Sequence, residues 1–167
     1  MPAKSDFTTD QWQAIRNAPQ LVALATAAAG NSGLFGSISE GMATASSIAE
    51  AVRGDQPLLR EVFDKDEMRA AQEQIRGMLK SVTDKSSLNS VLQRAAADAV
   101  RTALAALAAK GTKSESDAFQ SFLSGVADKV ANASKEGGFL GFGGERISEG
   151  EREFIARLKS MLGGTAA

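Results

Sequence analysis

The chain has 167 residues, of which 43% are hydrophobic and 23% are charged, a composition typical of one folded globular domain. It contains no cysteine, histidine or tyrosine, which excludes disulfides, thiolate metal sites, imidazole bases and the catalytic triads that use them. Without these residue types we do not expect an enzyme. The formal net charge of −1 shows no excess of basic residues, so we do not expect a nucleic-acid-binding protein either.

The first predicted unit is a helical hairpin over residues 8–54. Thr8 and Gln11 have the spacing of a capping box, which predicts a helix start. Pro19 is expected to bend this helix or break it in two, and Trp12 is expected to anchor it in the core. A glycine-containing loop after Ala29 then leads to a second helix.

Residues 56–110 are predicted to form the central helices. Pro57 opens a short one, and the acidic run that begins at Asp64 favours a helix start over an acidic patch. A long alanine-rich helix is expected over residues 86–109, where small residues on two stripes indicate close packing. Within it, Asp98 and Arg101 have the spacing of an ion pair, either partly buried or solvated.

The last unit is a second hairpin over residues 114–163. A helix over 114–135 precedes a glycine-rich loop, and Ser148 with Glu151 has the capping-box spacing for a final helix. No segment shows the alternating pattern of a strand. The sequence therefore predicts a single all-α domain over residues 1–167, a compact bundle of six to seven helices.

The two hairpins resemble each other along the chain. Gly30 and Phe35 have the same spacing as Gly137 and Phe142, and the run Ile-Ser-Glu-Gly follows in both copies. We interpret this as an internal duplication of helix, glycine loop and helix, related by a pseudo-two-fold axis around the central helices. The alternative is a chance likeness between alanine- and glycine-rich hairpins.

The glycine-rich loop over residues 137–144 invites comparison with a phosphate-binding loop. It lacks the Lys-Ser/Thr of the Walker sequence, and a helix rather than a strand precedes it. Glycine also permits tight turns, so a structural loop is the preferred interpretation.

Carboxylates gather around the same loop at Glu136, Glu145 and Glu149. Oxygen ligands between two helices suit a hard cation such as calcium, so these three residues are candidate metal ligands. The spacing is not that of an EF-hand, and a carboxylate in the first turn of a helix is also favoured by the helix dipole. Capping and solubility are therefore the preferred interpretation, and the metal site is the alternative.

Two segments, Ala133–Gly137 and Arg146–Glu151, resemble the signature of the TerB family of tellurite-resistance proteins, and Ala29–Asn31 with Ile38–Glu40 forms a weaker copy. That signature is a helix, a loop of Ala-Asp-Gly type, Ile-Ser, and a Glu that opens the next helix. The chain departs from it at the loop aspartate, which is replaced by asparagine in one copy and glutamate in the other.

The resemblance implies a small bacterial all-helical protein with pseudo-two-fold symmetry and a link to stress response. It also implies acidic loop residues that hold a divalent cation. The start of the chain lacks the pattern of a signal peptide, and the longest uncharged stretch, residues 17–39, is too polar to span a bilayer. We therefore expect a cytoplasmic protein.

The leading hypothesis is a non-enzymatic helical module that binds another protein, in the stress response that the resemblance implies. One alternative is a calcium-binding protein that uses Glu136, Glu145 and Glu149. A further alternative is a carrier of a small apolar ligand, because alanine-rich helices with several phenylalanines can enclose an apolar cavity.

Overall fold

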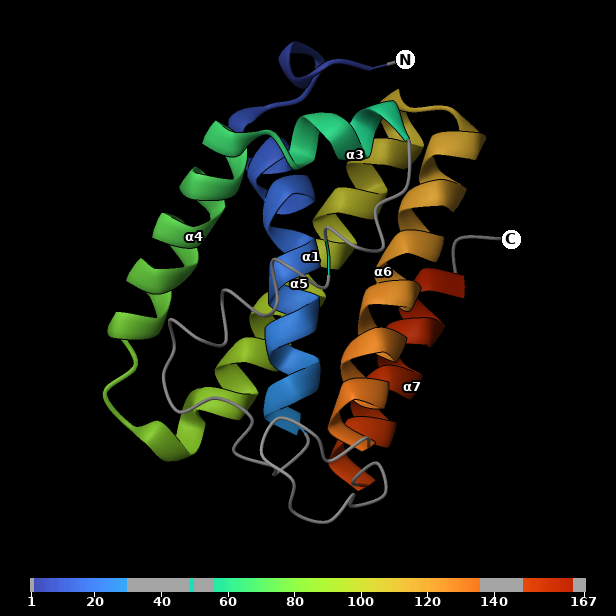
Figure 1. The fold of residues 1–167 in the computed structure, drawn as a ribbon. Coiled ribbons are helices and arrows are strands. Elements are labelled where there is room, and N and C mark those ends of the chain that lie inside the picture. The colour runs from blue at the N-terminus through green and yellow to red at the C-terminus, as the bar shows by residue number, and fades with distance from the viewer. Residues whose placement is uncertain (1, 30–48, 50–55, 136–148, 164–167) are drawn as a thin grey trace.

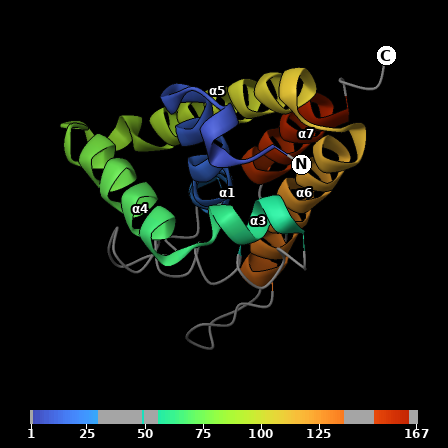
Figure 2. The same cartoon turned by 90° about the horizontal axis from the view of Figure 1, so that it is seen from above.

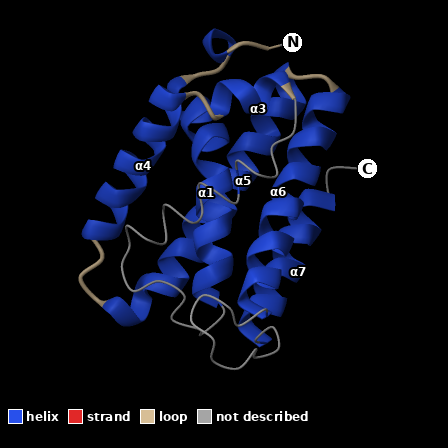
Figure 3. Cartoon of the chain, viewed as in Figure 1, coloured by secondary structure: helices blue, strands red, loops and turns tan. Residues whose placement is uncertain are grey.

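The computed structural model describes residues 2–29, 49, 56–135 and 149–163, and the regular structure in them is helical throughout (Figure 3). The elements in chain order are η1 (Lys4–Asp6), α1 (Thr9–Ala29), α3 (Pro57–Val62), α4 (Lys65–Lys80), η2 (Lys85–Ser87), α5 (Leu88–Lys110), α6 (Lys113–Lys135) and α7 (Glu149–Gly163). The all-α prediction is confirmed. None of these helices combines the length and the apolarity that a membrane crossing requires.

Helix α1 lies at the centre of the arrangement. It contacts α5 most extensively and also contacts α4, α6 and α7. Figure 1 shows α4 on one side of it and α6 with α7 on the other, and Figure 2, which looks down the bundle, shows the same helices around it. The N-terminal helix is therefore the core element of the fold.

The sequence of α1 explains this central position. Every residue from Asn17 to Ala27 is buried, and most of them are alanine, leucine or valine. A helix that is apolar on all sides has to be surrounded by other elements. Packing on several sides also explains why α1 continues through Pro19 as one helix, so the break that the sequence allowed there does not occur.

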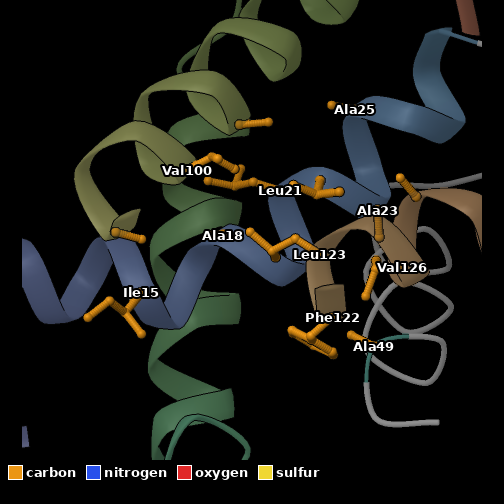
Figure 4. Close-up of a cluster of buried hydrophobic side chains, with 14 of the residues drawn as sticks. Ile15, Ala18, Leu21, Ala23, Ala25, Ala49, Val100, Phe122, Leu123 and Val126 are labelled. Atoms are coloured by element: carbon orange, nitrogen blue, oxygen red, sulfur yellow. The ribbon is translucent and has the colours of Figure 1, made fainter. Parts of the chain in front are cut away.

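The core is built where α1 meets α5 and α6. Figure 4 shows Leu21 of α1 beside Val100 of α5 and Ala18 of α1 beside Leu123 of α6, and all four side chains are buried. On α5, buried alanines bring the two helix backbones together: Ala96, Ala103 and Ala106. The small residues of the alanine-rich helix therefore serve the close packing that the sequence predicted.

Aromatic contacts join α3 to α6. The ring of Phe63, just after α3, meets the ring of Phe122 edge-on with 5.7 Å between centroids. Phe122 also lies 6.3 Å from Phe119 in the same helix. These rings attach the short α3 segment to the main bundle.

The predicted duplication remains a prediction. Helices α6 and α7 do contact each other as a hairpin. The second helix of the first predicted hairpin, apart from Ala49, and both glycine loops lie outside the described residues.

Candidate functional site

The predicted calcium ligands are described only in part. Glu149 is the first residue of α7 and is exposed, whereas Glu136 and Glu145 lie outside the described residues. Within the part of the chain that the structure describes, no three acidic residues come together as a metal site. The calcium site and the apolar-ligand carrier stay predictions, and no described contact adds support to either.

A different charged site surrounds Glu67, which the sequence analysis placed only within a predicted helix start. Glu67 is a residue of α4, is 8% exposed, and contacts α1 and the segment before α1. One of its oxygens, Oε2, accepts hydrogen bonds from Trp12 Nε1 at 2.9 Å and from Arg16 Nη1 at 3.3 Å. The other oxygen accepts from Lys4 Nζ. These four residues are called the Glu67 cluster below.

Local sequence explains how α4 presents Glu67. Asp64 caps the helix, because its Oδ1 accepts a hydrogen bond from Asp66 N at 2.9 Å. The helix start predicted there is confirmed. Glu67 then falls in the first turn, where the helix dipole favours a carboxylate, and it continues the buried stripe of Ala71, Ile75 and Leu79.

Helix α1 supplies two donors from one face. Trp12 and Arg16 are four residues apart, so their side chains project from neighbouring turns toward α4. Trp12 is 3% exposed, which confirms the prediction that it anchors the helix. The Arg16 side chain is 10% exposed and is therefore also largely removed from water.

A second set of polar contacts continues along the same seam. Gln74 Oε1 accepts hydrogen bonds from Arg16 Nη2 at 2.7 Å and from Asn17 Nδ2 at 3.0 Å. Gln74 Nε2 donates to Gln13 Oε1 at 3.0 Å. The α1–α4 seam thus carries a line of hydrogen bonds in addition to the buried apolar side chains of α4.

The environment keeps Glu67 ionised. Burial raises its pKa, but hydrogen bonds from Lys4, Trp12 and Arg16, together with the charge of Lys4, outweigh burial and leave the pKa below the ordinary value of 4.5. Both oxygens already accept from these donors. Glu67 is therefore suited to holding three segments together and unsuited to acting as a general acid or base.

The segment before α1 is attached at several points, and residues 2–8 are called the N-terminal strap below. The Lys4 backbone N–H donates to Glu61 Oε1 at 3.2 Å, and Lys110 Nζ donates to the Asp6 carbonyl at 2.6 Å. Phe7 packs on Trp12 with 6.0 Å between ring centroids, and Lys110 lies 5.7 Å from the Phe7 ring. The strap lies over the end of the bundle where α1 begins (Figure 1).

A hollow of about 290 Å³ lies between the strap and the first turns of α1. Its lining residues are Lys4, Ser5, Phe7, Thr8, Thr9, Trp12, Gln13 and Arg16. None of these side chains is a carboxylate, and all but Phe7 carry a hydrogen-bond donor. Phe7 and Trp12, which are 8% and 3% exposed, form a small apolar part of its wall.

The other predicted ion pair is formed but is not buried. Arg101 Nη1 lies 3.1 Å from Asp98 Oδ1, with side chains 70% and 61% exposed. Of the two alternatives, the solvated face is correct. Exposed pairs of this kind contribute little to stability, so the pair marks no site.

Comparison with known proteins finds no match among family models, curated proteins or solved structures.

Proposed function

We propose that the chain is a non-enzymatic helical module that binds another protein, and that a side chain of the partner enters the hollow beside Trp12. The observation that carries this proposal is the size and lining of the hollow. Its 290 Å³ lies at the lower limit of small-molecule sites, which span about 300–1,000 Å³. That volume suits an anchor side chain from a partner, and Trp and Arg are enriched at such anchor points.

The lining also indicates the chemistry of the anchor. Phe7 and Trp12 favour an apolar body, and the hydroxyls of Ser5, Thr8 and Thr9 favour hydrogen-bond acceptors. Lys4 and Arg16, the two cations of the lining, already pair with Glu67, so neither is free to attract a carboxylate from a partner. The best fit is a segment that combines an apolar side chain with a neutral acceptor, such as an amide or a main-chain carbonyl.

The Glu67 cluster supports a binding role over a catalytic one. A carboxylate that acts in general acid–base catalysis needs an oxygen open to the substrate. Glu67 is ionised and both its oxygens are engaged, so the cluster supplies a rigid floor behind the hollow. The resemblance to the TerB family extends the proposal to a role in bacterial stress response.

The test is site-specific photo-crosslinking in the native host. A photoreactive residue at Thr9, which is exposed and lines the hollow, should capture one defined partner. The same residue at Thr102, which is exposed on α5 and outside the hollow, should not. Capture with equal yield at both positions, or at neither, would overturn the proposed site.

A blocking variant then measures the contribution of the hollow. Thr9→Arg places a large side chain in the opening and should weaken binding of the captured partner at least tenfold, whereas Thr102→Arg should leave it unchanged. Trp12 is the single tryptophan of the chain, so its fluorescence reports on this site alone. Equal affinity of the Thr9→Arg variant and the unmodified protein would contradict the proposal.

A further inference from the structure

Half of the wall of the hollow comes from the N-terminal strap. Of the eight lining residues, Lys4, Ser5, Phe7 and Thr8 precede α1, and the remaining four lie on α1. The hollow therefore exists only while the strap is seated on the bundle. Its shape depends on whatever holds residues 2–8 in place.

The strap has little regular structure of its own, because η1 is a single short turn. It is held by contacts to three different helices: Glu61 of α3, Glu67 of α4 and Lys110 of α5. The burial of Phe7 against Trp12 adds an apolar contact. Seating thus depends on a few side-chain contacts between segments far apart in the chain.

Among these contacts, the ion pair between Lys4 and Glu67 can be removed most selectively. The Lys4 side chain is 54% exposed, whereas that of Glu67 is 11% exposed. When Lys4 loses its charge, Glu67 still keeps the hydrogen bonds from Trp12 and Arg16. The α1–α4 seam is therefore retained while the strap loses its charged anchor.

We propose that the N-terminal strap is a movable wall of the binding site, that the Lys4–Glu67 ion pair seats it, and that seating and partner binding are coupled. The coupling to a partner rests on the proposed function. The seating of the strap concerns the free protein and does not depend on that function. Lys4 is a positioning residue in this scheme. A partner that needs the seated strap also stabilises it, because the two equilibria are linked.

Hydrogen exchange on the free protein tests the seating. The backbone N–H groups of the strap donate to protein acceptors at Ala3, Lys4, Asp6, Phe7 and Thr8. In the Lys4→Met variant, which keeps the length of the stem, exchange of these amides should become at least tenfold faster. Amides of α5 and α6 should not change.

Two further variants make the result specific. Lys4→Arg keeps the positive charge and should restore slow exchange of the strap. Lys113→Met removes an exposed lysine that pairs with Asp117 on α6, and it should leave the strap unaffected. Equal strap exchange in Lys4→Met and the unmodified protein would overturn the seating, whether or not a partner exists.

The coupling is tested with the crosslinked partner, used as the purified protein. Strap exchange should slow further in the complex, and the Lys4→Met variant should bind more weakly than Lys4→Arg. If the strap amides exchange slowly in the free protein but the crosslinker at Thr9 captures no partner, the proposed function is contradicted and the seating of the strap is still supported. Binding with unchanged strap exchange would overturn the coupling.

Discussion

Gln20 carries a polar group that the core does not satisfy. The residue is 1% exposed. In the described part of the chain, its Oε1 has no hydrogen-bond partner and its Nε2 donates only to Met68 Sδ, at 3.8 Å. An unpaired buried polar group costs about 1–3 kcal/mol. We predict that Gln20→Met raises the free energy of unfolding by about 1 kcal/mol, because it removes the unpaired oxygen and keeps an unbranched side chain.

Urea unfolding measures this change, and Thr26→Val is the matched control. Thr26 is also buried in α1, but its Oγ1 donates to the Val22 carbonyl at 2.7 Å. Removal of a satisfied hydroxyl should bring no gain. A Gln20→Met variant no more stable than the unmodified protein would show that the oxygen is solvated or paired in solution.

Glu67→Gln removes the charge that three segments share. Arg16 is then left largely buried without a counter-charge, so we expect a loss of about 3 kcal/mol in the free energy of unfolding. Glu73→Gln is the matched control on the same helix, because Glu73 pairs with Arg69 at 3.6 Å on the exposed face. That control should change stability by less than about 0.5 kcal/mol, and similar losses for both variants would contradict a structural role for the cluster.

The Glu67→Gln variant also gives a prediction for the pH dependence of stability. Because the pKa of Glu67 is lowered in the folded protein, its contribution is complete above the ordinary value of 4.5. The contribution is then lost as the pH falls through the lower folded-state pKa. The stability difference between the unmodified protein and Glu67→Gln should therefore shrink in acid. Urea unfolding at a series of pH values checks this, and a constant difference would exclude an ionised Glu67 as its source.

At the scale of single elements, most helix positions could be predicted from local signals. The capping box at Thr8 is formed, with Gln11 N donating to Thr8 Oγ1 at 3.3 Å and Thr8 N donating to Gln11 Oε1 at 3.0 Å. The long central helix, predicted over residues 86–109, ends one residue later at Lys110 and begins two residues later at Leu88. The reason is a turn in which Asp84 accepts hydrogen bonds from the amide and hydroxyl of Ser86.

The candidate site could be predicted less well, because its contacts join distant segments. Sequence reasoning placed Glu67 in a helix start, and its position on the stripe of Ala71 and Ile75 was a usable signal that it is buried. Its partners Lys4 and Arg16 carry no local mark of that role. Only the packing of α4 on α1 brings them together, and periodicity does not specify which helices pack.

The close contact between α1 and α5 predicts that a larger side chain is tolerated at an exposed alanine of α5 but not at a buried one. Ala103 is fully buried on the face of α5 toward the core, and Ala105 is exposed two residues later. Ala103→Leu should destabilise the protein by about 1–3 kcal/mol, because the helices would have to separate to admit the larger side chain. Ala105→Leu should be close to neutral, and thermal unfolding of both variants compares them. Equal melting temperatures would show that α5 does not pack as described.

At the scale of the whole molecule, the central position of α1 predicts cooperative unfolding. The helices α4, α5, α6 and α7 all contact α1, so the loss of any one exposes apolar surface of the same helix. We expect one transition in which the calorimetric and van't Hoff enthalpies agree. A calorimetric enthalpy well above the van't Hoff value would show that part of the bundle melts separately.

The same central position has a consequence for synthesis on the ribosome. Helix α1 ends at Ala29, but its main neighbour α5 ends only at Lys110. At about 5–20 residues per second, the nascent helix waits on the order of 4–16 s for that neighbour. During this interval α5, α6 and α7 are not yet available, so the surface of α1 that these helices bury stays open to other nascent chains and to chaperones. The first helix to be made is thus among the last to be enclosed. The central contacts of the fold also join distant parts of the chain, so the folding rate should be slow for an all-helical protein of this size.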